Sequence, residues 1–329
     1  MDSLTQLLMG AAMGQLVLGK KEKGKGTLIG SFAGTLPDLD VIPLMNSSVI
    51  TQLSHHRGIS HSLLFSVTAP FLLAWLCQRF IKWNISFQRW LIFWILAFIT
   101  HIFLDLMTTW GTQILWPNPT RFSLDALFII DPLLSIPLLI GCVMTWKSKN
   151  TAPIQWGLII TSTYMLFAII AQQYMTQQFQ RKFDEQAIPI IQKIVRPTPF
   201  NTLFWAVTAR TDQDELIMAY ARLWDPIKHI QLSSPIPQNS IALQPILNRA
   251  DVQQLIQINK GLYVIAKDQD HIIIQDARFG RLGGWDPSSQ HRFVFNYYFN
   301  TQTQTWHQSR PEMPDAGKLL KGLWNKVFK

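Results

Sequence analysis

The chain of 329 residues is poor in charged residues and in cysteine. Only 15% of its residues are Asp, Glu, Lys or Arg, whereas soluble proteins average about 25%. Its two cysteines, Cys77 and Cys142, end separate apolar runs and form no CxxC pair. The low charge favours membrane spans over an ordinary soluble domain. The isolated cysteines exclude a disulfide framework or a zinc knuckle and are expected to pack as small hydrophobic side chains.

Familiar catalytic signatures are missing as well. The sequence contains no G-x-S-x-G, no P-loop and no H-E-x-x-H. The formal net charge is +9, but most Lys and Arg residues fall in short loops between apolar runs and in the C-terminal tail. Because positive loops commonly set membrane topology, we expect no nucleic-acid partner.

Six apolar segments fill the first half of the chain: 4–18, 27–45, 62–77, 90–108, 127–146 and 154–171. A helical span needs roughly 17–25 apolar residues, a length that the last four segments reach or nearly reach. The first two contain Gly10-x-x-x-Gly14 and Gly30-x-x-x-Gly34, a spacing that lets helices approach closely. We predict an all-α, multi-pass membrane bundle of about six helical segments over residues 1–171, in which these two segments pack against each other or the rest of the bundle.

Basic residues orient this predicted bundle. They lie between segments one and two, three and four, and five and six: Lys20, Lys21, Lys23, Lys25, Arg79, Lys82, Arg89, Lys147 and Lys149. The positive-inside rule places these loops in the cytoplasm. The other connections, 46–61 and 109–126, and everything after about residue 172 then lie on the outer side.

The composition changes after Gln172, where long apolar runs stop. We predict a linking helix over 172–195 and a smaller extracytoplasmic domain, α+β or mostly β, over 196–310. Alternating, β-branched and aromatic residues indicate its strands, at 202–210, 216–224, 261–266, 271–276 and 292–299. Residues 311–329 form a basic amphipathic tail, which either lies on an anionic membrane surface or packs on the protein.

Four of the eight histidines lie among the apolar segments and beside acids. They occur in His55-His56-Arg57-Gly58-Ile59-Ser60-His61 and in His101-Ile102-Phe103-Leu104-Asp105, while Pro37-Asp38-Leu39-Asp40 interrupts another apolar stretch. Ionisable groups within a membrane face a protein interior or a wet cavity and mark function. Histidine and aspartate are also ligands of zinc and similar ions. Since the predicted topology gathers all three pieces on the outer side, we infer a metal site there.

His101 and Asp105 are four residues apart and share one helix face. They can bind one ion, or Asp105 can orient a histidine ligand; a structural His–Asp hydrogen bond is the alternative. In the loop motif, Arg57-Gly58 permits a tight turn and Ser60 suits the cap of the next helix. His56 and His61 can then approach one point. His55 ranks second because it is suited to the surface.

Acids and a cation complete the expected site. Pro37 breaks the helix before Asp38 and Asp40, so one carboxylate can be a ligand and the other a base or further ligand. We assign Asp40 and Arg57 as catalytic residues, since a guanidinium suits a phosphate, although Arg57 can also anchor at the headgroups. Asp131, before Pro132, is predicted to cap a helix and is a second-rank site residue. The predicted metal ligands are Asp38, His56, His61, His101 and Asp105, with Zn²⁺ as the preferred ion.

Several motifs together resemble one bacterial family. They are Met1-Asp2-Ser3-Leu4-Thr5, Gly34-Thr35-Leu36-Pro37-Asp38-Leu39-Asp40, His56-Arg57-Gly58-Ile59-Ser60-His61-Ser62, His101-x-x-x-Asp105 and Asp131-Pro132. In these motifs the chain resembles the YdjM-type membrane-bound metal-dependent hydrolases, and more loosely so through Pro197-Thr198-Pro199-Phe200-Asn201.

That family is similar to zinc-dependent phospholipase C proteins, whose all-helical site uses His and Asp ligands. The resemblance implies a hydrolase of the bacterial inner membrane that acts on a phosphoester or lipid-like substrate. Some relatives carry a histidine directly after the early threonine, where this chain has Gln6. The resemblance therefore implies that one coordination position is lost here or filled by water.

We predict a membrane-bound metal-dependent hydrolase in which metal-activated water attacks a substrate near the outer membrane interface. A nearby carboxylate takes the proton. Membrane lipid and a phospholipid-like or phosphoester substrate are the expected partners. The alternative is a non-catalytic envelope assembly or stress factor, with a structural His/Asp network or structural metal. A transporter is less favoured because the sequence shows no internal repeat.

Overall fold

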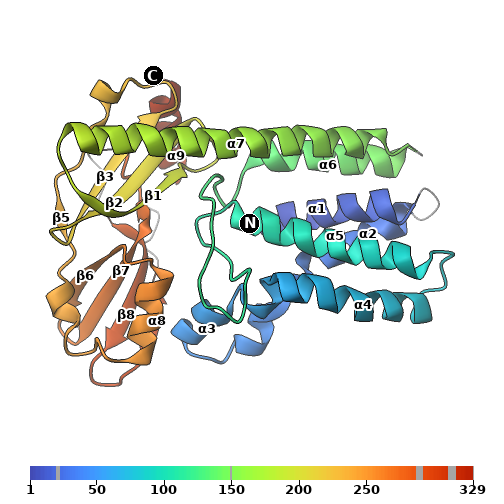
Figure 1. Cartoon of the computed structure of the whole chain (residues 1–329), viewed down its shortest axis with the longest axis horizontal. Coiled ribbons are helices and arrows are strands. Elements are labelled where there is room, and N and C mark those ends of the chain that lie inside the picture. Colours follow the sequence, from blue (N-terminus) through green and yellow to red (C-terminus); the bar gives the residue numbers. More distant parts are fainter. Residues whose placement is uncertain (20–22, 149, 287–291, 310–315, 329) are drawn as a thin grey trace. The chain divides into compact units, whose positions relative to one another are not determined.

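The computed structural model describes residues 1–19, 23–148, 150–286, 292–309 and 316–328. The chain divides into two compact units, the first helical and the second rich in strands (Figure 1). The first unit comprises residues 1–45, 55–170 and 199–201. The second comprises 46–54, 171–198 and 202–329, so it takes a short insertion from the first half of the chain.

Helices make up the first unit, as predicted. They are α1 (Ser3–Val17), α2 (Lys23–Thr35), α4 (Leu63–Phe80), α5 (Phe87–Leu106), α6 (Pro132–Lys147) and the first half of α7 (Ala152–Glu185). Within the described residues, α4, α5 and α7 are long and apolar enough to cross a membrane, and α6 is apolar but shorter. A helical domain with several span-like helices is confirmed, while the number of six spans stays a prediction.

One face of α5 is buried and the other is exposed. Side chains at helical spacing form the core of the first unit: Trp90, Phe93, Trp94, Ala97 and Phe98. The opposite side exposes Ile92, Leu96, Ile99 and Phe103, as a lipid-facing surface requires. His101 and Asp105 continue the buried stripe. The periodicity that builds the core therefore also carries these two polar side chains into the protein interior.

Glycines bring α1 and α2 into close contact. A side chain at Gly10 would overlap the carbonyl oxygen of Gly30, and one at Gly14 would overlap that of Gly26. A side chain at Gly34 would likewise overlap the carbonyl oxygen of Gln6. Close packing between the two glycine-containing segments is thus confirmed. The contact sets the end of α2, and the backbone that follows it, beside the start of α1.

Two antiparallel sheets form the second unit (Figure 1). The first contains β1 (Ile190–Pro197), β2 (Phe204–Thr211), β3 (Glu215–Arg222) and β4 (Gln231–Leu232) in that order, and β5 (Ile236–Pro237) also pairs with β3. The second has the order β6 (Tyr263–Asp268), β7 (His271–Arg281), β8 (Phe293–Asn300) and β9 (Trp306–Ser309). The β-rich second domain is therefore confirmed.

Helices cover these sheets. Phe179 and Phe183 of α7 pack with Trp205 and Val207 of β2. Leu255 of α8 (Ala250–Ile258) lies in the cluster under the second sheet. Ile50 of α3 (Val49–His55) joins that same cluster. This packing explains why residues 46–54 fold with the second unit.

The linking helix is shorter than the sequence predicts. We expected it to run to residue 195, but α7 ends at Glu185 and β1 begins at Ile190. Ala187 adopts a left-handed conformation with φ of 52°, and its N–H donates to the carbonyl oxygen of Asp184, which closes the helix. Ile190–Pro197 then pairs with β2. The residues assigned to the end of the helix are thus strand.

The predicted strands and buried cysteines are confirmed. The five expected strands coincide with β2, β3, β6, β7 and β8, with boundaries shifted by a few residues. In the predicted tail, residues 311–315 and 329 lie outside the described residues, and α9 (Ala316–Phe328) forms the rest. Cys77 and Cys142 are buried and unbridged, as expected.

Candidate metal centre

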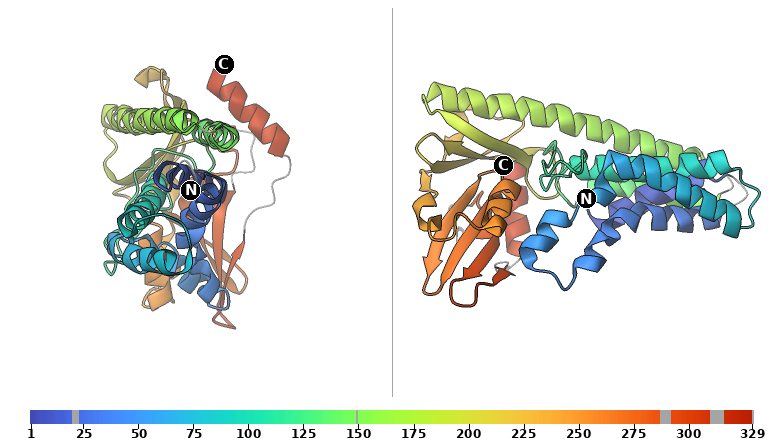
Figure 2. Two further views of the ribbon diagram at one scale, coloured as in Figure 1. Left: turned by 90° about the vertical axis from the view of Figure 1, so that its right-hand side faces the viewer. Right: turned by 60° about the horizontal axis from the view of Figure 1, so that its bottom comes forward.

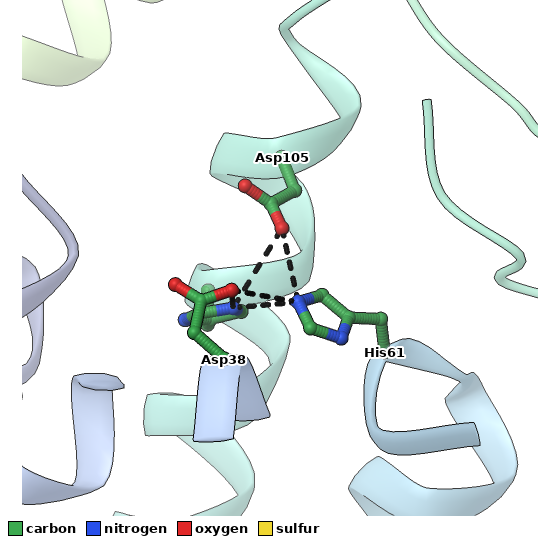
Figure 3. A group of neighbouring side chains, drawn as sticks. Asp38, His61 and Asp105 are labelled. Atoms are coloured by element: carbon green, nitrogen blue, oxygen red, sulfur yellow. Dashed lines mark hydrogen bonds and ion pairs between the residues drawn. The ribbon is translucent and has the colours of Figure 1, made fainter. Parts of the chain in front are cut away.

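Four polar side chains converge in the first unit (Figure 3). Asp38 comes from the 3₁₀ helix Leu36–Leu44 and His61 from the 3₁₀ turn Ile59–His61, while His101 and Asp105 come from α5. One ligand atom from each lies within 4.8 Å of all the others. The side chains of His61, His101 and Asp105 are fully buried, whereas that of Asp38 is 24% exposed. Asp38 is therefore the one member of the group with a solvent-exposed side chain.

The spacing of these atoms suits a tetrahedral ion. His61 Nε2 lies 3.0 Å from His101 Nε2, 3.2 Å from Asp38 Oδ1 and 3.1 Å from Asp105 Oδ2. His101 Nε2 lies 3.6 Å from Asp38 Oδ1 and 3.7 Å from Asp105 Oδ2. Ligands bound to a tetrahedral Zn²⁺ at about 2.0–2.1 Å are about 3.3 Å apart. The five distances scatter around that value.

Both imidazoles are oriented with Nε2 toward the group. His101 Nδ1 donates to the carbonyl oxygen of Gly34 at 2.7 Å. The Ser60 hydroxyl donates to Asp40 Oδ2 at 2.9 Å, so His61 Nδ1, also 2.9 Å from Ser60 Oγ, is the donor in that contact. A histidine that donates through Nδ1 presents the Nε2 lone pair to a metal. The surrounding backbone and side chains thus select the ligating tautomers.

The two carboxylate oxygens of Asp105 make different contacts. Oδ1 accepts from Gln6 Nε2 at 3.1 Å, lies 3.2 Å from an Arg57 guanidinium nitrogen and contacts the amino group of Met1. Oδ2 is buried and faces the histidines, 3.1 Å from His61 Nε2 and 3.7 Å from His101 Nε2. A buried carboxylate oxygen needs a cationic partner, which a protonated His61 at 3.1 Å or a bound metal ion can supply. This oxygen and the donor set therefore fit a divalent ion.

Nearby carboxylates control the charge of His61 when no metal is bound. Burial alone lowers the pKa of an imidazole. The carboxylates of Asp105, Asp38 and Asp40 outweigh burial and raise the pKa of His61 to about 10. His61 is consequently protonated at neutral pH in the metal-free protein. A cation that binds there has to replace that proton.

Asp40 and His56, both expected in the site, lie next to the four-residue group and outside it. Asp40 Oδ1 is 2.8 Å from His56 Nδ1, and Asp40 Oδ2 accepts from the backbone N–H of Arg57 and from Ser60. His56 Nε2 has no hydrogen-bond partner among the described residues, and its side chain is 26% exposed. The structure thus places Asp40 behind His61 and leaves one nitrogen of His56 open.

Arg57 points inward. Its side chain is 5% exposed, and its guanidinium contacts Asp105 Oδ1 and Thr108 Oγ1. Arg57 itself adopts the positive φ, 62°, at the expected tight turn. Gly58 is needed for space, because a Cβ there would lie 2.8 Å from the carbonyl oxygen of His55. The helix cap is Ser62, which accepts from the N–H of Phe65, so the expectation that Ser60 caps α4 is wrong.

The two second-rank residues lie away from the group. Asp131 caps α6 as predicted, accepting from the N–H of Leu133 at 3.0 Å and from the Tyr164 hydroxyl at 2.7 Å. His55 ends α3 and is exposed.

Gln6 is part of the surroundings that the residue pattern alone does not reveal. Gln6 is fully buried and donates to Asp105 Oδ1 and to the carbonyl oxygen of His101. The position where some relatives carry a histidine is therefore at the centre. Two features of the sequence point to Gln6: the family resemblance at this position, and a polar amide side chain within an apolar segment.

Comparison with known proteins identifies the family to which the first half of the chain is similar. Residues 1–175 match the model of a family described as YdjM inner membrane protein. The uncharacterized protein YfhP of Bacillus subtilis (strain 168) is 26% identical over 227 residues, covering 64% of this chain and 65% of YfhP. The inner membrane protein YbcI of Escherichia coli (strain K12) is 28% identical over 113 residues, covering 34% of this chain and 62% of YbcI. The matches thus span less than two thirds of either relative, and no solved structure matches the chain.

Proposed function

The chain belongs to the YdjM inner membrane protein family, and we propose that it is a metal-dependent hydrolase acting on a phosphoester or lipid-like substrate. The observation that carries the proposal is the convergence of Asp38, His61, His101 and Asp105, with Oδ2 of Asp105 buried and turned toward the Nε2 atoms of both histidines. Two imidazoles and two carboxylates suit Zn²⁺ among the common divalent ions. We propose that a substrate oxygen approaches beside Asp38, the one member of the group with an exposed side chain.

A bound divalent ion would polarise an ester oxygen and make hydroxide available near neutral pH. Asp38, His61, His101 and Asp105 would hold it. Arg57 keeps Asp105 in place through Oδ1 and adds a positive charge beside the centre. In this role Arg57 stabilises negative charge that develops on a phosphoester, rather than forming an exposed clamp.

We propose that His56 accepts the proton that the attacking water loses. Asp40 has both oxygens engaged by donors, so it orients His56 and His61 and is a poor acceptor. His56 receives that orientation through Nδ1 and keeps Nε2 open. Its ring centre lies 6.0 Å from that of His61. At this distance Nε2 can take a proton from a water molecule or return one to a leaving oxygen.

The location in the chain favours a substrate at the membrane surface. His61 lies two residues before the start of α4, and Asp105 lies in the last turn of α5. These are the two ends of a helical hairpin that would meet on one side of the bilayer, opposite the loop 81–86, which contains Lys82 and lies between Arg79 and Arg89. The positive-inside rule makes that side the outer one, and we propose the same side for the second unit.

A structural metal is the second candidate function. The observation in its favour is that His61, His101 and Asp105 are fully buried, as ligands of closed structural sites are. The chain would then be a non-catalytic envelope assembly or stress factor. Both candidates require the ion, so metal analysis comes first and turnover separates them.

The first experiment measures metal in protein purified without chelators. We expect about one equivalent of a divalent ion per chain in the wild type and little in His61→Ala and His101→Ala, since each removes a ligand. His229→Ala, an exposed histidine of the second unit, is the matched control and should bind as the wild type does. Absence of metal from the wild type would contradict both candidate functions.

The second experiment screens phosphodiester, phospholipid and peptide substrates with added metals. Asp38→Asn is the blank, because it changes the one partly exposed ligand. We expect phosphoester or phospholipid turnover that the blank lacks. Bound metal that stabilises the protein against heating, with no turnover of any class, would favour the structural candidate.

A further inference from the structure

The helix α9 divides its apolar residues between two faces (Figure 2, the red helix that ends at C). Leu323 and Val327, one turn apart, are fully buried and pack against Phe204 of β2. Leu203, Tyr220 and Trp285 border this cluster. One face of α9 is therefore already covered by the second unit, which holds the helix in place.

The second apolar face has no cover among the described residues. Leu320, Trp324 and Phe328 are 37%, 38% and 67% exposed, and they lie at i, i+4 and i+8 beside the covered face. The rings of Trp324 and Phe328 stack with centroids 5.6 Å apart. A neighbouring pair of large aromatic side chains on a surface helix marks a docking surface.

Charge accompanies this aromatic face. Between Ala316 and Phe328 the helix contains three lysines, Lys318, Lys321 and Lys326, and no acid. All three are exposed. An aromatic stripe flanked by lysines is the pattern of helices that lie in the headgroup region of an anionic bilayer.

We propose that the exposed face of α9 docks on an anionic lipid surface. Trp324 and Phe328 would enter the headgroup boundary while the lysines meet lipid phosphates. The charge complementarity selects lipid over another copy of α9, whose lysines would repel these. The chain's own span-like helices also keep a bilayer at high effective concentration, so a modest affinity suffices.

The test uses the full chain in lipid nanodiscs with single nitroxide labels. The two native cysteines are replaced (Cys77→Ala, Cys142→Ala), and one cysteine is introduced as Phe328→Cys on the aromatic face. Asn325→Cys, on the exposed polar side of the same helix, is the matched control. Collision of each label with oxygen, which enters lipid, and with a water-soluble nickel chelate is measured in phosphatidylcholine with and without phosphatidylglycerol.

With phosphatidylglycerol, the label at 328 is expected to collide more with oxygen and less with nickel, and the label at 325 to stay accessible to nickel. Replacing the three lysines by glutamine should weaken docking by about fivefold per lysine, and salt should weaken it too. A label at 328 that stays accessible to nickel in both bilayers would overturn the proposal. A label shielded from both reagents would also overturn it, because a protein surface would then cover the face.

Discussion

Asp38 and Asp40 show how the position of a single residue decides its chemistry. In a 3₁₀ helix each residue turns by about 120°, so residues two apart point in different directions. Asp38 faces the two Nε2 atoms, and Asp40 lies behind His61 at its Nδ1 side. We therefore propose that Asp38 is a metal ligand and that Asp40 orients the histidines. Their order in the sequence does not reveal which acid takes which role.

We predict that Asp40→Asn weakens metal binding by about 10–100-fold, the usual cost of removing an orienting carboxylate. The amide loses one of the two acceptor oxygens that hold His56, Ser60 and the Arg57 backbone. Affinity is measured by competition with a chromophoric chelator at fixed pH. Asp212→Asn, an exposed acid after β2, is the control and should have no effect. Equal affinities for both variants would mean that Asp40 does not orient the ligands.

Metal binding should also depend on pH through His61. The pKa of this imidazole is raised to about 10 in the metal-free protein, above its ordinary value of 6.5. Below that raised pKa a cation must displace one proton, so apparent affinity should rise by about tenfold per pH unit. The apparent affinity should level off as the pH approaches the pKa of His61, because His61 then loses its proton without metal.

Titrations at several pH values between about 6 and 9 follow this dependence. Calorimetry in buffers of different ionisation enthalpy counts the released protons. One proton per ion is expected near neutral pH. An affinity that is independent of pH, with no proton release, would show that His61 is neutral before metal binds. In His101→Ala, whose affinity is lower, the slope should persist because His61 still binds a proton.

At the scale of elements, the helices position the residues of the candidate metal centre through contacts that also build the core. The buried face of α5 carries His101 and Asp105. The contact between α1 and α2 places Gly34, whose carbonyl oxygen orients His101, beside Gln6, which binds Asp105. Small side chains along this contact therefore affect the metal centre indirectly.

We predict that Gly30→Ala destabilises the first unit by about 1–3 kcal/mol, because the added methyl overlaps the Gly10 backbone and overpacks the contact. Metal content should fall with it, since Gly34 moves with α2. Thermal unfolding in detergent and metal analysis measure the two effects. Gly24→Ala in the same helix is the control: its Cβ would meet only the Trp146 side chain, at 3.3 Å. Equal stability of the two variants would contradict a tight α1–α2 contact.

Sequence patterns predicted the elements better than their ends. The i, i+4 spacing of His101 and Asp105 and the small-residue spacing of α1 and α2 each depend on one local rule, and both appear in the structure. The end of α7 depends on Ala187, which adopts a left-handed conformation without being glycine, so no residue type announces it. The open Nε2 of His56 likewise results from tertiary contacts to Asp40, which sequence spacing does not encode.

At the scale of the whole molecule, the hairpin of α4 and α5 ties the metal centre to membrane topology. The candidate metal centre lies where α4 begins and α5 nears its end, so we expect the loop that joins these two candidate spans on the other side of the membrane. That loop contains Lys82 and is flanked by Arg79 and Arg89. Basic residues keep such loops in the cytoplasm. The argument uses only this hairpin and is independent of whether the chain has six spans.

The same rule predicts the outer side for the second unit, because α7 starts after the basic residues Lys147 and Lys149 and runs away from them. We predict that alkaline phosphatase fused after Gln186 is active and that a green fluorescent protein fused there is dark. Fusions after Trp83, in the α4–α5 loop, should give the opposite pair and serve as the internal control. Fluorescence at 186 with phosphatase activity at 83 would invert the topology and put the metal centre and its substrate on the cytoplasmic side. The same readout at both positions would mean that α5 or α7 does not span the membrane.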